Sequence, residues 1–428
     1  MREPVESNDA VWLQDSATNL MVINGLFISD RLDVATVSEA FRQRVIEADG
    51  GRRYPRFRRR ITWVMGDPYW EDDPDFDVAR HIIPAREPGL TTTEQLQRYV
   101  GAEASRPLPD DRPRWQFQVV EEFEGGGSAC LMRIHHSMGD GVSLMAVIFS
   151  FMEALADSDN GSGPDAIRPA SGAPGRDLLK LIRIPFAAPK VLIQRLLWPR
   201  DRHALHGPKV SGKKQVAWTE PFDMEVLKDV KNRLGATVND VLMACVSGAL
   251  SRYLQRHAGE VVRKIHVSMP VNIRPPNEPL SMGNRFAAVP LVLPAGIAGV
   301  RERVAAVKQR MDALKRSVEP IVVFGLQSAL LMVLPQAASK VLIDFLANKC
   351  TAVVTNVPGP QRGLALAGRR VRSMMFWVPQ RADIAVGISI LSFAGKVQVG
   401  VIADARLVPD AGDLARAFEE EFQALRAL

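Results

Sequence analysis

The seven residues HHSMGDG at positions 135–141 decide how this chain is interpreted. The mostly apolar run from Ser128 to Ile134 predicts a buried strand before them, and apolar residues at helical spacing predict a helix after them. Because successive side chains on a strand point to opposite faces, the imidazoles of His135 and His136 are expected to diverge. An imidazole at the end of a strand can accept a proton, since its usual pKa lies near neutrality.

Asp140 follows His136 by four residues and can fix a loop arginine, an imidazole or the amides of the following helix. Gly139 and Gly141 are expected to permit backbone angles that other residues resist. The alternative is a satisfied core histidine with an aspartate that caps the helix, and the motif alone leaves both interpretations open. A metal site is the weaker functional alternative, because no further His, Cys or carboxylate stands at a useful short spacing.

Composition narrows the class of protein. The chain has 428 residues, 46% hydrophobic and 24% charged, which suits a globular protein of about two or three domains. Three widely separated cysteines next to apolar runs predict buried, reduced thiols, and the N-terminus lacks a signal-peptide core, so we expect a cytoplasmic protein. The net charge of +6 favours anionic partners, but no nucleic-acid module is recognisable, so a nucleic-acid partner is not expected.

A stretch rich in Gly, Pro, Ser and Asp at 157–177 predicts a linker between two parts of the chain. Strands and helices come in mixed order on both sides of it, which favours an α/β sandwich over a doubly wound sheet. Strands are expected near 21–29, 115–122, 264–271, 286–293, 383–392 and 396–403, and helices near 34–48, 93–105, 222–234, 238–257, 300–315 and 413–425.

Two apolar segments raise the question of membrane contact. Basic and apolar residues alternate in the segment 177–200, where Pro185 and Pro189 are expected to break any helix into short pieces. This segment either packs one domain onto the other or lies on an anionic membrane surface. The segment 321–334 is too short to cross a bilayer and predicts a buried helix.

A second set of polar residues begins at Thr237, which forms a capping box with Asp240 at the start of a predicted helix. Asn239 then lies in the first turn, near free amides and the positive helix end, where it could stabilise an oxyanion or be an ordinary solvated side chain. Asn272 and Asn356 follow strands in turns of ordinary composition. No serine-hydrolase elbow, phosphate-binding loop or dinucleotide fingerprint occurs, which favours a histidine acting alone on a substrate hydroxyl.

Taken in order, these motifs resemble the bacterial wax ester synthase/diacylglycerol acyltransferase (WS/DGAT) family, within the coenzyme A-dependent acyltransferases that share HHxxxDG. The resemblance spans about residues 19–407. Its further motifs are RPL at 106–108, PRW at 113–115, VNDV at 238–241, Asn272, Gly283-Asn284, TNVPGP at 355–360 and ILSFAG at 390–395. One departure is Arg114, where family members usually have leucine, which questions the local packing or the acyl-chain path.

The resemblance implies a fold of two chloramphenicol acetyltransferase-like α/β sandwich domains with an active-site tunnel between them. The expected division is a motif-bearing domain at 1–157, a linker and crossover at 158–210, and a second domain at 211–428. His136 is implied as the general base that takes the proton of an alcohol or diacylglycerol hydroxyl, which attacks acyl-CoA without an acyl-enzyme. His135 and Asp140 would be architectural, and Asn239 would support the oxyanion or the base. The implied substrate-binding residues are Trp115, Gly141, Asn272, Asn284, Thr355 and Asn356.

The implied partners are acyl-CoA as co-substrate and a long-chain alcohol or diacylglycerol, with no cofactor and no metal. A peripheral contact with the inner face of a membrane or with a lipid droplet is a further expectation. Two alternatives stay open at this point. One keeps the chemistry and changes the acceptor to a glycolipid or polyketide hydroxyl, and the other is a non-catalytic lipid-binding protein.

Overall fold

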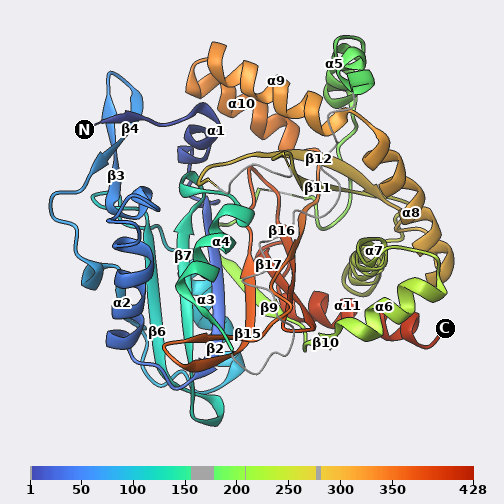
Figure 1. Cartoon of the computed structure of the whole chain (residues 1–428). Helices are drawn as coiled ribbons and strands as arrows, with labels where there is room; N and C mark the ends of the chain where they lie inside the picture. Colours follow the sequence, from blue (N-terminus) through green and yellow to red (C-terminus); the bar gives the residue numbers. More distant parts are fainter. Residues whose placement is uncertain (1, 156–177, 208, 276–280) are drawn as a thin grey trace.

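The computed structural model describes residues 2–155, 178–207, 209–275 and 281–428 (Figure 1). It contains two seven-stranded sheets and one sheet of three strands. The predicted linker at 157–177 lies outside the described residues. The small sheet has the order β1-β4-β3, with the strands β1 (Glu3–Pro4), β4 (Asp67–Asp72) and β3 (Arg59–Val64).

The first large sheet carries the histidine motif at the end of β7. Its order is β5-β6-β7-β2-β15-β14-β8. The strands are β5 (Ile82–Pro84), β6 (Trp115–Phe123), β7 (Gly127–His135), β2 (Val22–Asp30), β15 (Arg369–Trp377), β14 (Leu364–Leu366) and β8 (Glu153–Ala154). Every residue of β7 is buried, because hydrophobic cores cover both faces of the strand. This explains why the run 128–134 is mostly apolar and does not alternate between apolar and polar residues.

Two strands of this sheet come from the C-terminal half of the chain. β15 pairs with β2 in antiparallel register, with Met375 opposite Leu26, and β14 links β15 to β8. The expected boundary at residue 211 assigns both strands to the second domain, whereas the hydrogen bonds place them in the first sheet. The two halves are therefore interlocked by their backbone.

The second large sheet is built wholly from residues after 210. Its path is β10-β17-β16-β13-β11-β12, and β9 pairs with β17. The strands are β10 (Phe222–Asp223), β17 (Lys396–Asp404), β16 (Val386–Phe393), β13 (Ala352–Pro358), β11 (Ile265–Asn272), β12 (Phe286–Leu293) and β9 (Lys214–Trp218). The observed β11 and β12 match the strands expected near 264–271 and 286–293.

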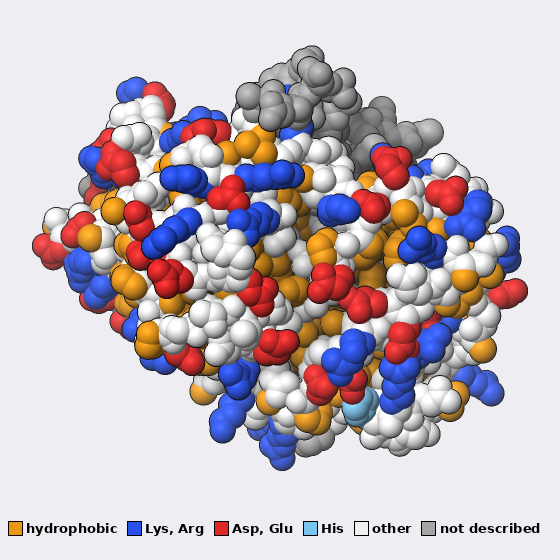
Figure 2. Space-filling view, turned by 90° about the horizontal axis from the view of Figure 1, so that it is seen from below, with side chains coloured by type: hydrophobic (Ala, Val, Ile, Leu, Met, Phe, Trp, Pro, Cys, Tyr) orange, Lys and Arg blue, Asp and Glu red, His pale blue; other side chains and the backbone are white. Residues whose placement is uncertain are grey.

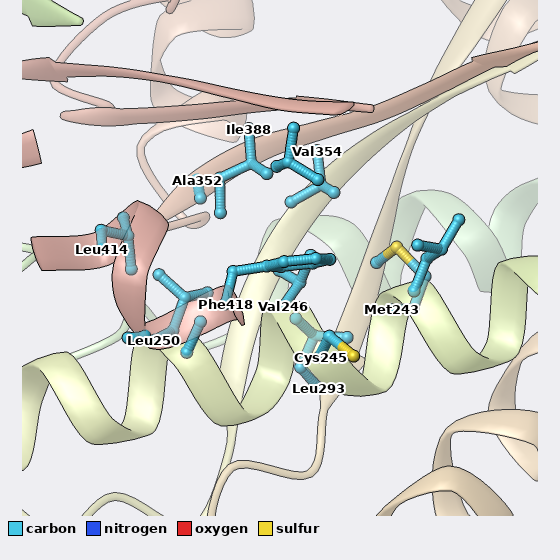
Figure 3. Packing of buried hydrophobic residues seen from close by; sticks show 14 of the residues in the cluster. Met243, Cys245, Val246, Leu250, Leu293, Ala352, Val354, Ile388, Leu414 and Phe418 are labelled. Carbon is cyan, nitrogen blue, oxygen red and sulfur yellow. The ribbon is translucent and has the colours of Figure 1, made fainter. Parts of the chain in front are cut away.

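Helices cover the two sheets (Figure 1). The described helices are α1 (Ser7–Ala10), α2 (Val34–Phe41), α3 (Thr93–Ala104), α4 (Gly141–Phe151), α5 (Leu178–Leu197), α6 (Met224–Arg233), α7 (Val238–Ala258), α8 (Val300–Arg316), α9 (Glu319–Val333), α10 (Gln336–Ala347) and α11 (Ala411–Arg426). The central helix α7 packs against α11 and the second sheet. There Val246 and Leu250 lie close to Phe418, and Val354 and Ile388 face them from the strands (Figure 3). The α/β sandwich class predicted from the mixed element order is confirmed.

Two predictions about helices are wrong. α5 is one continuous helix through Pro185 and Pro189, because its packing against α9 offsets the destabilisation by the two prolines. The segment 321–334 is not a buried helix, since in α9 Met332 and Val333 are each 80% exposed. Its first turns pack against β12 and α5 through Val322 and Val323, and the last turn has no such cover among the described residues.

Charged side chains of both signs are spread over the face seen from below, and hydrophobic side chains gather near its middle (Figure 2). All three cysteines are free and buried, as predicted. Within the described ranges no single helix is long and apolar enough to cross a membrane, although two bent pairs, α6 with α7 and α8 with α9, reach that length and composition together.

Candidate active site

A cavity of about 940 Å³ lies between the two halves of the molecule, and its lining is mostly apolar. One wall carries the histidine loop and the short helix η1 (Val11–Leu13) of the first half. The opposite walls come from β11, β12 and the helices α5 and α7–α10 of the second half. Seven of the ten predicted catalytic and substrate-binding residues line it: His136, Asp140, Gly141, Asn239, Asn272, Thr355 and Asn356.

His136 begins the single turn η6 (His136–Met138) directly after β7. Its imidazole is stacked on the indole of Trp12, with the ring centroids 3.8 Å apart and the planes 11° from parallel. The ring of Phe286 lies 5.7 Å away on β12. Nδ1 is buried without a hydrogen-bond partner, so packing against two aromatic rings holds this imidazole in place.

Burial lowers the pKa of His136 to about 4, and this effect outweighs the negative charge of Asp140, which raises it. An imidazole with this pKa is neutral throughout the physiological range. It therefore keeps a free lone pair for a proton from a substrate.

His135 points away from the cavity, as the alternation of a strand predicts. Its Nε2 lies 2.9 Å from Asp15 Oδ2, and the Ser137 amide donates to its Nδ1. Because Nδ1 accepts that bond, the proton is on Nε2, which donates to Asp15. Burial lowers the pKa of His135, although Asp15 raises it. This neutral ring ties the end of β7 to the N-terminal segment and is architectural.

Arg114 has a partner in the same cluster. Its guanidinium lies 3.5 Å from Asp15 Oδ2, and it is not among the residues that line the cavity. The charge that departs from the family pattern is thus balanced by an acidic side chain.

Asp140 caps α4 and joins the two halves. Its Oδ1 accepts from the amide of Ser143, and its Oδ2 accepts from Arg274 Nη1 at 2.6 Å and from the amide of Arg285 at 3.0 Å. Both sequence options, a loop arginine and helix amides, therefore occur together. The expected backbone role of the glycines is not observed: the φ of Gly139 is 165°, an ordinary extended value. Position 139 requires glycine because there is no room for a side chain: a Cβ there would lie 2.5 Å from Ser143 Oγ.

Asn284 holds the histidine loop from the second half without lining the cavity. Its Nδ2 donates to the carbonyl of His136 at 2.8 Å and to Asp9 Oδ1 at 2.8 Å. Asp9 also pairs with Arg56 at 2.7 Å, and Arg56 donates to the carbonyls of Ser137 and Met138. The expected substrate-binding role of Asn284 gives way to one in positioning the loop.

Asn239 lies in the first turn of α7, between Thr237 and Asp240, which form the capping box that the sequence predicted. The side chain of Asn356 donates to Asn239 Oδ1 at 3.1 Å. This bond uses the carbonyl of the Asn239 amide and leaves its two N–H groups as the free polar end. Thr355 and Asn272 line the same cavity from β13 and β11.

Trp115 does not belong to the site. It is 1% exposed, its Nε1 donates to the carbonyl of Phe57, and its ring stacks on His81 at 4.4 Å. Trp115 is therefore a core residue of the first half, where its large ring contributes to packing.

Sequence reasoning missed several residues that shape the loop: Asp9, Trp12, Asp15, Arg56, Arg274 and Phe286. Arg274 stands two positions after Asn272 in a turn that was noted only for its asparagine, and Trp12 stands in an N-terminal segment considered only for targeting. The described part of the chain contains no group of three or more His, Cys, Asp or Glu side chains that could hold a metal ion.

Two sandwich halves enclose an apolar cavity at the HHxxxDG loop, and solved structures of an acyltransferase and of a condensation domain share this fold. The structure is similar to the wax ester synthase/diacylglycerol acyltransferase of Marinobacter aquaeolei VT8, with a TM-score of 0.72, 22% identity and coverage of 99% of this chain and 100% of that one. It is also similar to the first condensation domain of the calcium-dependent antibiotic synthetase, with a TM-score of 0.64, 18% identity and coverage of 100% and 96%.

The chain belongs to the WS/DGAT family. The profile of the wax ester synthase/diacylglycerol acyltransferase catalytic domain matches residues 6–196, and that of the WS/DGAT C-terminal domain matches residues 282–426. A putative diacylglycerol O-acyltransferase of Mycobacterium tuberculosis is 28% identical over 392 residues, which cover 84% of this chain and 82% of the relative. The O-acyltransferase WSD of Acinetobacter baylyi is 23% identical over 394 residues, with coverage of 86% and 84%. The protein is therefore an O-acyltransferase of this type.

Proposed function

We propose that this protein transfers a long-chain acyl group from acyl-CoA to the hydroxyl of a fatty alcohol or diacylglycerol, and that His136 is the general base. The observation that carries the proposal is a neutral imidazole in the wall of a large apolar cavity between the halves. Such a cavity suits hydrocarbon chains, and a neutral imidazole suits the removal of one hydroxyl proton.

In the proposed reaction the acceptor hydroxyl gives its proton to Nε2 of His136 while its oxygen attacks the thioester carbonyl. The C–S bond then breaks, and the proton passes from the imidazolium to the departing CoA thiolate. General base catalysis supplies roughly 10²–10⁴-fold in rate. Alignment of the two substrates in the cavity supplies much of the remainder.

Direct attack without an acyl-enzyme fits the surroundings of the base. In the described structure no serine, threonine or cysteine side chain is hydrogen-bonded to the His136 ring, whose partners are Trp12 and Phe286. Cys350 lines the same cavity, but burial raises the pKa of its thiol to about 12, so the thiolate nucleophile is scarce.

We assign Asn239 to the oxyanion that forms when the thioester carbonyl is attacked. Its N–H groups belong to a side chain that is oriented by Asn356 and seated at the positive end of α7. Donors fixed before the reaction stabilise developing charge without reorganisation, which is the requirement of such a site.

The test measures free thiol released from hexadecanoyl-CoA, with and without hexadecanol or dioleoylglycerol. Release is expected only when an acceptor is present, and His136→Ala is expected to lower it by at least about 100-fold. The matched control is His257→Ala, a half-exposed histidine on α7 away from the cavity lining. Full transfer by a folded His136→Ala variant contradicts the mechanism, and thiol release without acceptor indicates hydrolysis instead.

We further propose that the outer surface of α5, α9 and α10 contacts a membrane or lipid droplet from the cytoplasmic side. α9 lies beside α5 and α10 at the top of Figure 1. The surface carries seven exposed large hydrophobic side chains: Ile193, Leu196, Leu197, Met332, Val333, Val341 and Phe345. Exposed Lys190 and Arg200 lie on and just after α5, so apolar and cationic contacts are combined, as peripheral helices require.

Flotation with vesicles that contain anionic lipid tests this surface. The triple change of Leu197, Met332 and Val333 to serine is expected to remove most of the binding, because about 80% of each side chain is already exposed and the fold does not depend on them. Met65→Ser, at a fully exposed residue in the first half, is the control. Unchanged flotation of the triple variant contradicts the proposed contact.

A further inference from the structure

A second histidine lines the same cavity far from His136. His266 lies near the start of β11, six residues before Asn272, which corresponds to about 20 Å along a strand. Asn272 is opposite Phe286, the ring that packs beside His136. The two histidines therefore face distant parts of one continuous apolar space.

His266 is held by a carboxylate. Asp201 Oδ1 lies 2.5 Å from its Nδ1, and Asp201 Oδ2 accepts from its backbone amide at 2.8 Å and from Thr351 Oγ1 at 2.7 Å. Burial raises the pKa of Asp201, but the bonds from His203, His266 and Thr351 outweigh it and hold the pKa below the usual range. The carboxylate is ionised and can only accept, so the N–H of His266 Nδ1 donates a hydrogen bond to Asp201.

This arrangement leaves one unused polar atom. With Nδ1 bonded to Asp201, Nε2 is the ring nitrogen to which no described protein atom is bonded. The ring is 2% exposed and stands edge-on to Trp198 at 5.2 Å. A polar atom that faces a mostly apolar space is unfavourable unless a bound molecule forms a hydrogen bond with it.

We propose that His266 Nε2 binds a hydroxyl group carried by the distal part of a long chain in the cavity. The substrate class is either a long-chain acyl group with a hydroxyl far from its thioester, or a long-chain alcohol with a second hydroxyl far from the one that reacts. This inference rests on the proposed function, which identifies the bound molecule as a long-chain acyl group or alcohol. Ser268, the next residue of β11 on the same face, also lines the cavity and adds a second polar group there.

Binding tests the inference without any transfer reaction. The affinities of the protein for hexadecanoic, 2-hydroxyhexadecanoic and 16-hydroxyhexadecanoic acid are compared by tryptophan fluorescence. Only the 16-hydroxy acid is expected to bind more tightly than hexadecanoic acid, by about 3- to 10-fold, the usual net contribution of one buried hydrogen bond. Equal affinity for all three acids overturns the proposal, as does an equal preference for both hydroxy acids.

Variants separate the imidazole from its surroundings. His266→Phe is expected to abolish the preference while hexadecanoic acid binds within about twofold of the original affinity, and His266→Gln, which keeps an acceptor, is expected to retain part of the preference. His257→Phe is the control, because His257 lies on α7 away from the cavity lining and pairs with Asp413 instead of Asp201. A preference that survives His266→Phe, or that folded His257→Phe loses equally, overturns the assignment.

Transfer assays then identify which substrate carries the hydroxyl. One arm combines 16-hydroxyhexadecanoyl-CoA with hexadecanol, and the other combines hexadecanoyl-CoA with 1,16-hexadecanediol. A rise in kcat/KM that requires His266 is expected in one arm. Transfer in both arms with no dependence on His266 overturns the proposal. If no acceptor supports transfer, the proposed function fails, and the binding comparison alone decides the role of His266.

Discussion

The indole of Trp12 is stacked on the imidazole of His136, with centroids 3.8 Å apart and planes 11° from parallel. Trp12 lies in η1 near the N-terminus, and the two residues are 124 positions apart in sequence. Because Nδ1 of His136 has no hydrogen-bond partner, aromatic packing takes the orienting role that a carboxylate has in many histidine bases. Trp12 is thus a positioning residue for the proposed base.

Loss of this stack is expected to lower kcat more than it raises KM. An aromatic pair contributes about 0.5–1.5 kcal/mol beyond its burial, so Trp12→Leu is expected to lower kcat by roughly 3- to 10-fold, while Trp12→Phe retains most of the rate. Acceptor-dependent thiol release measures both variants. A rate for Trp12→Leu equal to that of the unchanged protein removes the positioning role.

The lowered pKa of His136 predicts an unusual pH profile. A general base must be unprotonated, and burial lowers the pKa of this one to about 4, so kcat/KM is expected to be flat from pH 8 down to about 5 and to fall only near pH 4. Below that pKa the imidazole is protonated and cannot accept a proton, so kcat/KM falls as the pH is lowered. Circular dichroism at each pH confirms that the protein stays folded. A half-maximal rate at pH 6.5 contradicts the burial effect.

The buried pair of Asp140 and Arg274 is expected to matter for stability. Arg274→Met leaves the Asp140 carboxylate, which is 4% exposed, without its cationic partner. Removal of one member of a buried pair typically costs about 3–5 kcal/mol in the free energy of unfolding, measurable by urea denaturation. Arg31→Met, in the exposed pair with Glu122, is the control and is expected to change nothing measurable. Equal midpoints for the two variants contradict the structural role of the pair.

Asn239 offers a test of the oxyanion assignment. Asn239→Ala is expected to lower kcat by about 10²-fold with little change in KM, because the interaction forms only in the transition state. Asn356→Ala, which removes the side chain that orients Asn239, is expected to have a smaller effect in the same direction. A KM effect alone for Asn239→Ala assigns the residue to ground-state binding instead.

Arg114→Leu restores the residue usual in the family. It tests whether the ion pair of Arg114 with Asp15 contributes to stability or to acyl transfer. Asp15 keeps its bond from His135 in this variant, so the free energy of unfolding is expected to change by less than about 1 kcal/mol and transfer to continue at the same rate. Asp15→Asn is expected to cost more, because both Arg114 and His135 lose their anionic partner. A large loss of transfer in Arg114→Leu contradicts the view that Arg114 lies outside the acyl path.

Local patterns located most of the described helices and the strands β2, β6, β7, β11, β12, β16 and β17 within a few residues, because hydrophobic periodicity depends only on neighbours along the chain. The other described strands, β13 and β15 among them, were not predicted. The same local rules misjudged α5, where tertiary packing kept a helix through two prolines, and α9, whose apolar residues indicated burial but lie partly exposed. Trp115 matched a family motif but serves the core, since a motif does not report which side of a sheet a residue faces.

The sequence by itself determined the histidine loop, the capping box of Thr237 and Asp240, the sandwich class and the family. Each depends on residues that are close together in the chain or on an ordered set of motifs. Only the tertiary structure decided that Arg274 binds Asp140, that Asn284 and Asp9 hold the loop, and that Trp12 rather than a carboxylate orients His136. These partners lie more than 100 residues apart in the chain. The bonds of Arg274 and Asn284 form where the two halves meet around one cavity, and the stack of Trp12 forms where η1 packs against η6 within the first half.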